Sequence, residues 1–234
     1  MLASWLAPIL RVVHNPRRID RERLMPFDLP PVTRTLLIAN VGIYLLQMLT
    51  GDALLIHFAL WPLGPSHYAD VPGFEPWQLV TYSFLHGGLA HIAFNMLALW
   101  MFGGPIERLF GSRPFALYYF VCVVGAAVAQ LLVMAYWTGG YYPTLGASGG
   151  IFGLLLAYGM MYPHARIMLL FPPIPMPAWL FVIGYGALEL FLGVTGTQAG
   201  VAHFAHLGGM AIGFVLIQYW RGKLPVRPRR ILMR

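Results

Sequence analysis

Long runs of apolar residues, each close to the length of a membrane crossing, alternate with short polar segments along the chain. A bilayer-spanning α-helix needs about 20 apolar residues, and the strictly alternating pattern of a membrane β-strand does not occur here. The prolines between Pro172 and Pro177 are incompatible with a helix. The pattern therefore predicts an all-α bundle of six transmembrane helices, at about residues 34–50, 84–103, 114–136, 148–163, 178–193 and 202–220.

The segments outside these runs divide the chain into three parts. Residues 1–33 mix arginines and prolines with apolar residues spaced for one helical face, which indicates a short helix on the membrane surface. Residues 34–222 form the six-helix domain, and residues 223–234 form a basic tail. The loop after the first span carries Phe58 and Trp61, which predicts that it lies at the membrane interface.

The positive charges test the number of spans independently. Six spans place both termini and the loops at 104–113 and 163–177 on one side, and all 15 basic residues fall on that side. The opposite loops contain none, so the positive-inside rule predicts that both termini are cytoplasmic. The excess of lysine and arginine thus indicates the orientation of the protein in the membrane. It does not predict binding to nucleic acid, because the chain has no compact basic domain.

Composition agrees with a protein whose solvent is the lipid bilayer. Hydrophobic residues make up 59% of the 234 residues and charged residues only 10%, with a mean hydropathy of +0.68. A soluble domain carries about 25% charged residues, so this is an integral membrane protein. The single Cys122 excludes an internal disulfide.

Polar side chains inside the spans are costly and are therefore candidates for function. Ser148 and His206 each lie 15 residues, roughly 22 Å, from the inner ends of their spans. His91 lies about 13 residues, roughly 20 Å, from an inner end near Gly104, and Asn95 is one turn below it on the same face. In a hydrocarbon core of about 30 Å these groups share one level, roughly 8–10 Å below the outer surface.

Small residues recur every fourth position on the fourth and sixth spans and allow the two helices to approach closely. They are Gly149, Gly153 and Ala157, and Ala205, Gly209 and Gly213. Contact between these faces would bring His206 to Ser148. His206 could then take the serine proton and later protonate a leaving amine, while His91 and Asn95 donate hydrogen bonds to the oxyanion.

Three separated motifs follow one another along the chain: Phe84-Leu-His86-x4-His91-Ile-Ala-Phe-Asn95, Gly146-Ala-Ser148-Gly149, and Ala205-His206-Leu-Gly-Gly209-x3-Gly213. In this order they resemble the motifs of the rhomboid family of intramembrane serine proteases, over about residues 34–220. A further stretch, Gly103-Gly104-x2-Glu107, is similar to the family's turn after the second span.

The resemblance implies a catalytic dyad with Ser148 as nucleophile and His206 as base, without metal or cofactor. It implies an oxyanion hole formed by His91, Asn95 and the Ser148 amide, and cleavage of single-span proteins near the outer boundary of the bilayer. With no organelle-targeting sequence, we expect a prokaryotic plasma membrane and a site on its extracytoplasmic side. The residues expected to have structural or supporting roles are His86, His203, Gly146, Gly149, Gly209 and Gly213. Phe152 departs from the family, which often has tyrosine there.

Two alternatives stay open. A catalytically silent rhomboid-like protein that binds membrane helices would be expected to lack the nucleophile or the base. A metal site or transporter could use histidines, but no His-Glu-x-x-His motif accompanies them. A triad would place a carboxylate on His206, but since the resemblance implies a dyad, we expect Glu189 to form a hydrogen bond at the outer rim.

Overall fold

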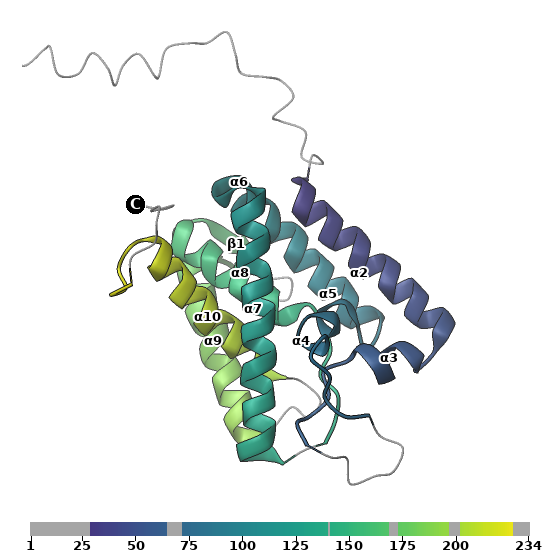
Figure 1. Ribbon diagram of the computed structural model, residues 1–234. Coiled ribbons are helices and arrows are strands. Elements are labelled where there is room, and N and C mark those ends of the chain that lie inside the picture. The colour runs from purple at the N-terminus through teal and green to yellow at the C-terminus, as the bar shows by residue number, and fades with distance from the viewer. Residues whose placement is uncertain (1–28, 65–71, 140, 169–172, 197–201, 227–234) are drawn as a thin grey trace, which may run out of the picture.

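The computed structural model of the protein describes residues 29–64, 72–139, 141–168, 173–196 and 202–226. The expected surface helix falls mainly on residues 1–28, and most of the basic tail falls on residues 227–234; both lie outside the described residues. The main helices are α2 (Pro31–Thr50), α5 (Leu89–Ala98), α6 (Gly104–Phe110), α7 (Ser112–Val133), α8 (Ser148–Met161), α9 (Ala178–Thr195) and α10 (His203–Trp220). They form one bundle (Figure 1).

Among the described residues, four helical stretches are long and apolar enough to cross a membrane. They are Pro31–Thr50, Leu89–Phe110, Ser112–Thr138 and Ala178–Thr195. Helix α8 is apolar but has only 14 residues, and α10 has 18. The protein is therefore a mostly helical integral membrane protein. These lengths and compositions do not test the expected number of six spans.

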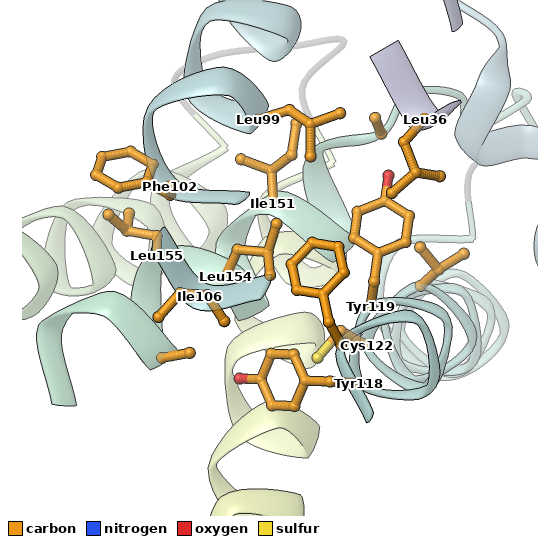
Figure 2. Close-up of a cluster of buried hydrophobic side chains, with 14 of the residues drawn as sticks. Leu36, Leu99, Phe102, Ile106, Tyr118, Tyr119, Cys122, Ile151, Leu154 and Leu155 are labelled. Atoms are coloured by element: carbon orange, nitrogen blue, oxygen red, sulfur yellow. The ribbon is translucent and has the colours of Figure 1, made fainter. Parts of the chain in front are cut away.

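Helix α8 lies at the centre of the bundle. Nine of its 14 residues are buried, and its apolar side chains point in all directions, as expected for a helix surrounded by other helices. Figure 2 shows Ile151, Leu154 and Leu155 of α8 packed among side chains from neighbouring helices. These neighbours are Leu36, Leu99, Phe102, Ile106, Tyr118, Tyr119 and Cys122.

Glycines bring α8 into close contact with α10, as the small-residue pattern predicted, and bring both helices close to α7, which the pattern did not predict. A Cβ on Gly209 would collide with the backbone carbonyl of Gly149, so α10 lies directly against the first turn of α8. The other glycines of the pattern face α7: a Cβ on Gly153 would strike Cys122, and one on Gly213 would strike the Tyr118 hydroxyl. The start of α8 is thus fixed by backbone contact.

The prediction for the second span was wrong at both ends. The helix begins only at Leu89, because Gly88 before it is extended. It also does not turn at Gly103-Gly104 but continues through a π-helical segment, η3 (Leu99–Gly103), into α6. The wider turn of η3 lies just before Pro105, which cannot supply a helical N–H. Gly103 serves a close approach instead, since a Cβ there would lie 3.1 Å from Thr33 of α2.

The fold is not entirely α-helical. Strands β1 (Arg166–Met168) and β2 (Pro175–Pro177) form a small antiparallel pair between α8 and α9. The loop after α2 folds into α3 (Ala53–Phe58), α4 (Gln78–Thr81) and the short 3₁₀ helix η2 (Tyr82–Phe84). The hydrophobic pattern did not predict these short elements, because segments of three to six residues are too short to show a helical or strand period.

All basic residues among the described ones lie at one end of the bundle. They lie at the start of α2, in α6, at the start of α7, in β1 and after α10, which occupy the upper part of Figure 1. At this end the Glu107 carboxylate accepts hydrogen bonds from the Val32 and Thr33 amides and from the Ser112 hydroxyl, at 2.7 to 3.0 Å. It therefore joins α6 to the free N-termini of α2 and α7.

Candidate active site

Ser148 is the first residue of α8, and the loop before it is held at two points. Leu60 and Thr144 exchange backbone hydrogen bonds of 2.9 Å, and the Gly146 amide donates to the Tyr82 carbonyl at 3.0 Å. Gly146 has φ +122°, a conformation that L side chains rarely adopt. A sharp, pinned turn therefore delivers Ser148 to the helix start, where the first amides lack helical partners.

The structure places His206 beside Ser148. The Nε2 atom of His206 lies 2.8 Å from the serine Oγ, across 58 residues of sequence. The ring of Phe152, one turn after Ser148 on α8, is stacked on the His206 ring, with centroids 4.2 Å apart and planes at 5°. The position at which the family often has tyrosine thus supplies a flat apolar surface that fixes the imidazole plane.

Glu189 does not lie at an outer rim, and that expectation was wrong. Its side chain is buried, and its Oε2 lies 2.9 Å from Nδ1 of His206 and 2.6 Å from Nδ1 of His203. Helix α9 packs along α10, which brings the carboxylate to two histidines one turn apart. His203, expected in a supporting role, therefore contacts the site through Glu189.

His91 and Asn95 of α5 lie against the loop that leads to Ser148. A Cβ on Gly146 would lie 2.8 Å from His91 Nε2 and 3.7 Å from Asn95 Nδ2. The Gly87 amide donates to His91 Nδ1 at 3.3 Å, so a neutral His91 carries its hydrogen on Nε2, toward Gly146. Asn95 Nδ2 is buried and has no hydrogen-bond acceptor among the described residues. Both side chains line the same cavity as Ser148.

The expected depth of His91 rested on the wrong helix end. The helix continues to Phe110 and not to Gly104, and His91 lies in its first turn. The depth of His91 can therefore not be obtained by counting residues from Gly104. Its position beside Ser148 comes from Gly146, which lets the loop and α5 approach.

His86 lies in the loop between η2 and α5 and is buried. Its backbone exchanges two hydrogen bonds with the Gln47 side chain of α2, at 2.9 and 3.1 Å. Burial, with a smaller effect of neighbouring His91, lowers the pKa of His86 to about 4, so it is neutral near pH 7. The ring packs edge-on against His91, with centroids 5.1 Å apart, and thus supports the position of that side chain.

A cavity of about 770 Å³ opens onto these residues. Ser148, His206, Glu189, His91 and Asn95 all line it. Side chains of α5, η3 and α9 complete its walls, including Phe94, Phe102, Phe181 and Tyr185. The cavity therefore combines an apolar surface with a serine hydroxyl, an imidazole and hydrogen-bond donors.

Glu189, His203 and His206 are also the one group in the described part of the chain whose ligand atoms could surround a metal ion, all within 4.8 Å of one another. The carboxylate already accepts hydrogen bonds from both Nδ1 atoms. The two Nδ1 atoms are thus each hydrogen-bonded to Glu189 Oε2, whereas His203 Nε2 is buried without a partner among the described residues.

Sequence reasoning missed the contact between Glu189 and His206 and the two pairings that hold the serine loop. One signal for the first was present: Glu189 was the single carboxylate in the outer half of a predicted span. No comparable signal marks the Leu60–Thr144 bridge, because it joins two loops 84 residues apart.

Comparison with known proteins adds an independent finding. The family model described as "Rhomboid domain" matches residues 73–222. The chain is 27% identical over 222 residues to the protein named Rhomboid protease GlpG from Yersinia pestis (strain Pestoides F), covering 93% of this chain and 72% of that protein. It is 28% identical over 194 residues to the protein of the same name from Serratia proteamaculans (strain 568), covering 81% of this chain and 62% of that protein.

Proposed function

Since this chain belongs to the rhomboid family, we propose that it is an intramembrane serine endopeptidase whose nucleophile is Ser148 and whose general base is His206. The observation that carries the proposal is the 2.8 Å contact between Ser148 Oγ and His206 Nε2 at the wall of a cavity. A silent family member has no need of this contact. It is the geometry that an activated serine requires.

The reaction follows from the arrangement of the side chains. Ser148 Oγ attacks the carbonyl carbon of the scissile peptide bond while its proton moves to His206 Nε2. The developing oxyanion accepts hydrogen bonds from His91 Nε2–H, Asn95 Nδ2–H and the Ser148 amide. His206 then gives the proton to the leaving amine. Water then attacks the acyl carbonyl while His206 takes one of its protons, and His206 returns that proton to Ser148 Oγ as the ester bond breaks, which releases the acid product and restores Ser148.

The length of α8 supports a site below the membrane surface. Its 14 residues span about 21 Å, well short of a hydrocarbon core of about 30 Å. If its inner end lies at the basic end of the bundle, Ser148 is recessed from the other surface. We therefore propose six spans, cytoplasmic termini, a bacterial inner membrane, and an extracytoplasmic site that cleaves single-span substrates near the outer boundary.

The test is cleavage of a model single-span protein by the purified protein in detergent. Ser148→Ala and His206→Ala should each lose nearly all turnover, and the double variant should be no worse than the weaker single variant, because residues of one catalytic unit are strongly non-additive. A serine-directed fluorophosphonate should label the wild type at Ser148 and should label His206→Ala far more slowly. Equal turnover by wild type and Ser148→Ala would contradict the proposal.

A further inference from the structure

The buried carboxylate of Glu189 completes a chain of polar contacts across three helices. It begins on α9 with Glu189 Oε2, 2.9 Å from His206 Nδ1, and ends on α8 with Ser148 Oγ, 2.8 Å from His206 Nε2. Each imidazole nitrogen of His206 thus has one partner. A carboxylate, an imidazole and a hydroxyl in this order are the parts of a serine-protease triad.

We infer that Glu189 is a positioning residue for His206, and that the site works as a Ser148–His206–Glu189 triad and not as a dyad. The inference rests on the proposed function, because it concerns the base of that same reaction. It adds a third group, on a helix that carries neither the nucleophile nor the base.

The chemical effect follows from the fact that an ionised carboxylate can only accept hydrogen bonds. With Oε2 at Nδ1, the neutral His206 ring carries its hydrogen on Nδ1, and the Nε2 lone pair faces the serine hydroxyl. In the other tautomer Nε2–H would point at Oγ and could not take its proton. The negative charge also stabilises the imidazolium that forms during attack.

The surroundings fix the carboxylate as well as the ring. His203 places its Nδ1 2.6 Å from the same Oε2, so two donors from one face of α10 hold one oxygen. Phe152 covers the His206 ring at 4.2 Å and prevents it from turning out of plane. The whole group is buried, with Glu189 4%, His203 5% and His206 9% exposed. Such burial strengthens the interaction between the carboxylate and the imidazolium.

A simpler interpretation is that Glu189 only joins α9 to α10. Helix α9 buries little of its surface, so a hydrogen bond of this kind would matter for its docking. The two interpretations differ in what they predict. Loss of a joining residue lowers the amount or stability of folded protein, whereas loss of a positioning residue lowers kcat in molecules that remain folded.

The experiment compares Glu189→Gln with the wild type on the single-span substrate in detergent, with rates expressed per folded molecule. Glutamine keeps the size of the side chain but removes the charge and can present its NH₂ group to Nδ1. We expect kcat to fall at least about tenfold with KM within about threefold, since the equivalent loss in a serine-protease triad reaches about 10⁴. Fluorophosphonate labelling of Ser148 should slow in parallel.

Glu189→Asp is the conservative variant, because it keeps the charge one methylene further back. It should retain more activity than Glu189→Gln if the charge matters. If Glu189→Gln folds poorly, the labelling rate of Glu189→Asp against wild type still tests the inference. A kcat that falls less than tenfold in Glu189→Gln, or an aspartate variant less active than the glutamine variant, overturns it.

Glu107→Gln is the matched control. It makes the same change at Glu107, the other buried carboxylate of the described residues, whose hydrogen bonds join α6 to α2 and α7 and do not involve His206. It should lower thermal stability and leave kcat of the folded fraction near that of the wild type. Ser148→Ala measured in parallel separates the two claims: if it is inactive while Glu189→Gln is fully active, the protease proposal stands and only the triad fails.

Discussion

Gly209→Ala should damage both the fold and the reaction, because the neighbour of Gly209 cannot move aside. The added Cβ would collide with the backbone carbonyl of Gly149, the residue after the nucleophile, and not with the end of a flexible side chain. Restoring an ordinary van der Waals distance of about 3.4 Å needs α8 and α10 to separate by on the order of 1 Å. That separation pulls His206 from Ser148, now 2.8 Å apart.

Two magnitudes follow for this variant. Overpacking of a well-packed core costs about 1–3 kcal/mol, and misplacement of reacting groups by about 1 Å can cost about 10²-fold in rate. We therefore expect a lower midpoint of thermal unfolding in detergent and a kcat lower by about 10² per folded molecule, with KM less affected.

Two matched variants show whether the carbonyl contact is responsible. Gly184→Ala on α9 meets no atom within 4 Å and should leave both stability and kcat unchanged. Gly213→Ala meets the Tyr118 hydroxyl, a side-chain atom further from Ser148, and should reduce stability with a smaller effect on kcat. Wild-type turnover by Gly209→Ala, measured beside Gly184→Ala, would refute the argument that this backbone contact sets the distance between serine and histidine.

Two further predictions concern the oxyanion donors and the orientation. His91→Ala and Asn95→Ala should each keep measurable turnover, with a rate about 10²–10³-fold lower than that of the wild type, because each removes one oxyanion donor and leaves Ser148 and His206 in place. Inactivity as complete as that of Ser148→Ala would contradict this assignment. In a background without Cys122, a cysteine at Leu63 should react with an impermeant thiol reagent added outside cells and a cysteine at Arg166 should not; the opposite pattern would reverse the orientation.

The contact between Ser148 and His206 could be predicted because it depends on a repeating feature. Small residues at every fourth position of α8 and α10 favour close packing of these two helices. Two polar residues at the same depth on such a pair, Ser148 and His206, are then expected to meet. The central, short α8 was likewise predicted closely, since Ser148 and Pro163 bound its apolar run. Periodicity and depth are therefore informative where helices pack along their whole length.

Other features depend on which neighbour a residue meets, and the sequence does not contain that information directly. Gly103-Gly104 was interpreted as a turn, yet Gly103 permits close contact with Thr33 on α2. Glu189 was assigned to the rim because the resemblance implies a dyad, and the rotation of α9 about its axis, which brings Glu189 to His206, could not be known from the sequence. Its 17-residue separation from His206 places the two on different helices, so no helical spacing relates them.

The hydrogen bonds of the site support Asn95 as a donor of the proposed oxyanion hole. Inside a membrane protein each buried polar group needs a partner, and Ser148, His206, Glu189 and His203 supply partners to one another. Asn95 Nδ2 differs, because the described residues offer it no acceptor. An unsatisfied buried donor costs about 1–3 kcal/mol, and a hydrogen bond to an acceptor offsets this cost. In the proposed mechanism the carbonyl oxygen that acquires charge at Ser148 is such an acceptor, and no group among the described residues competes with it for Asn95 Nδ2.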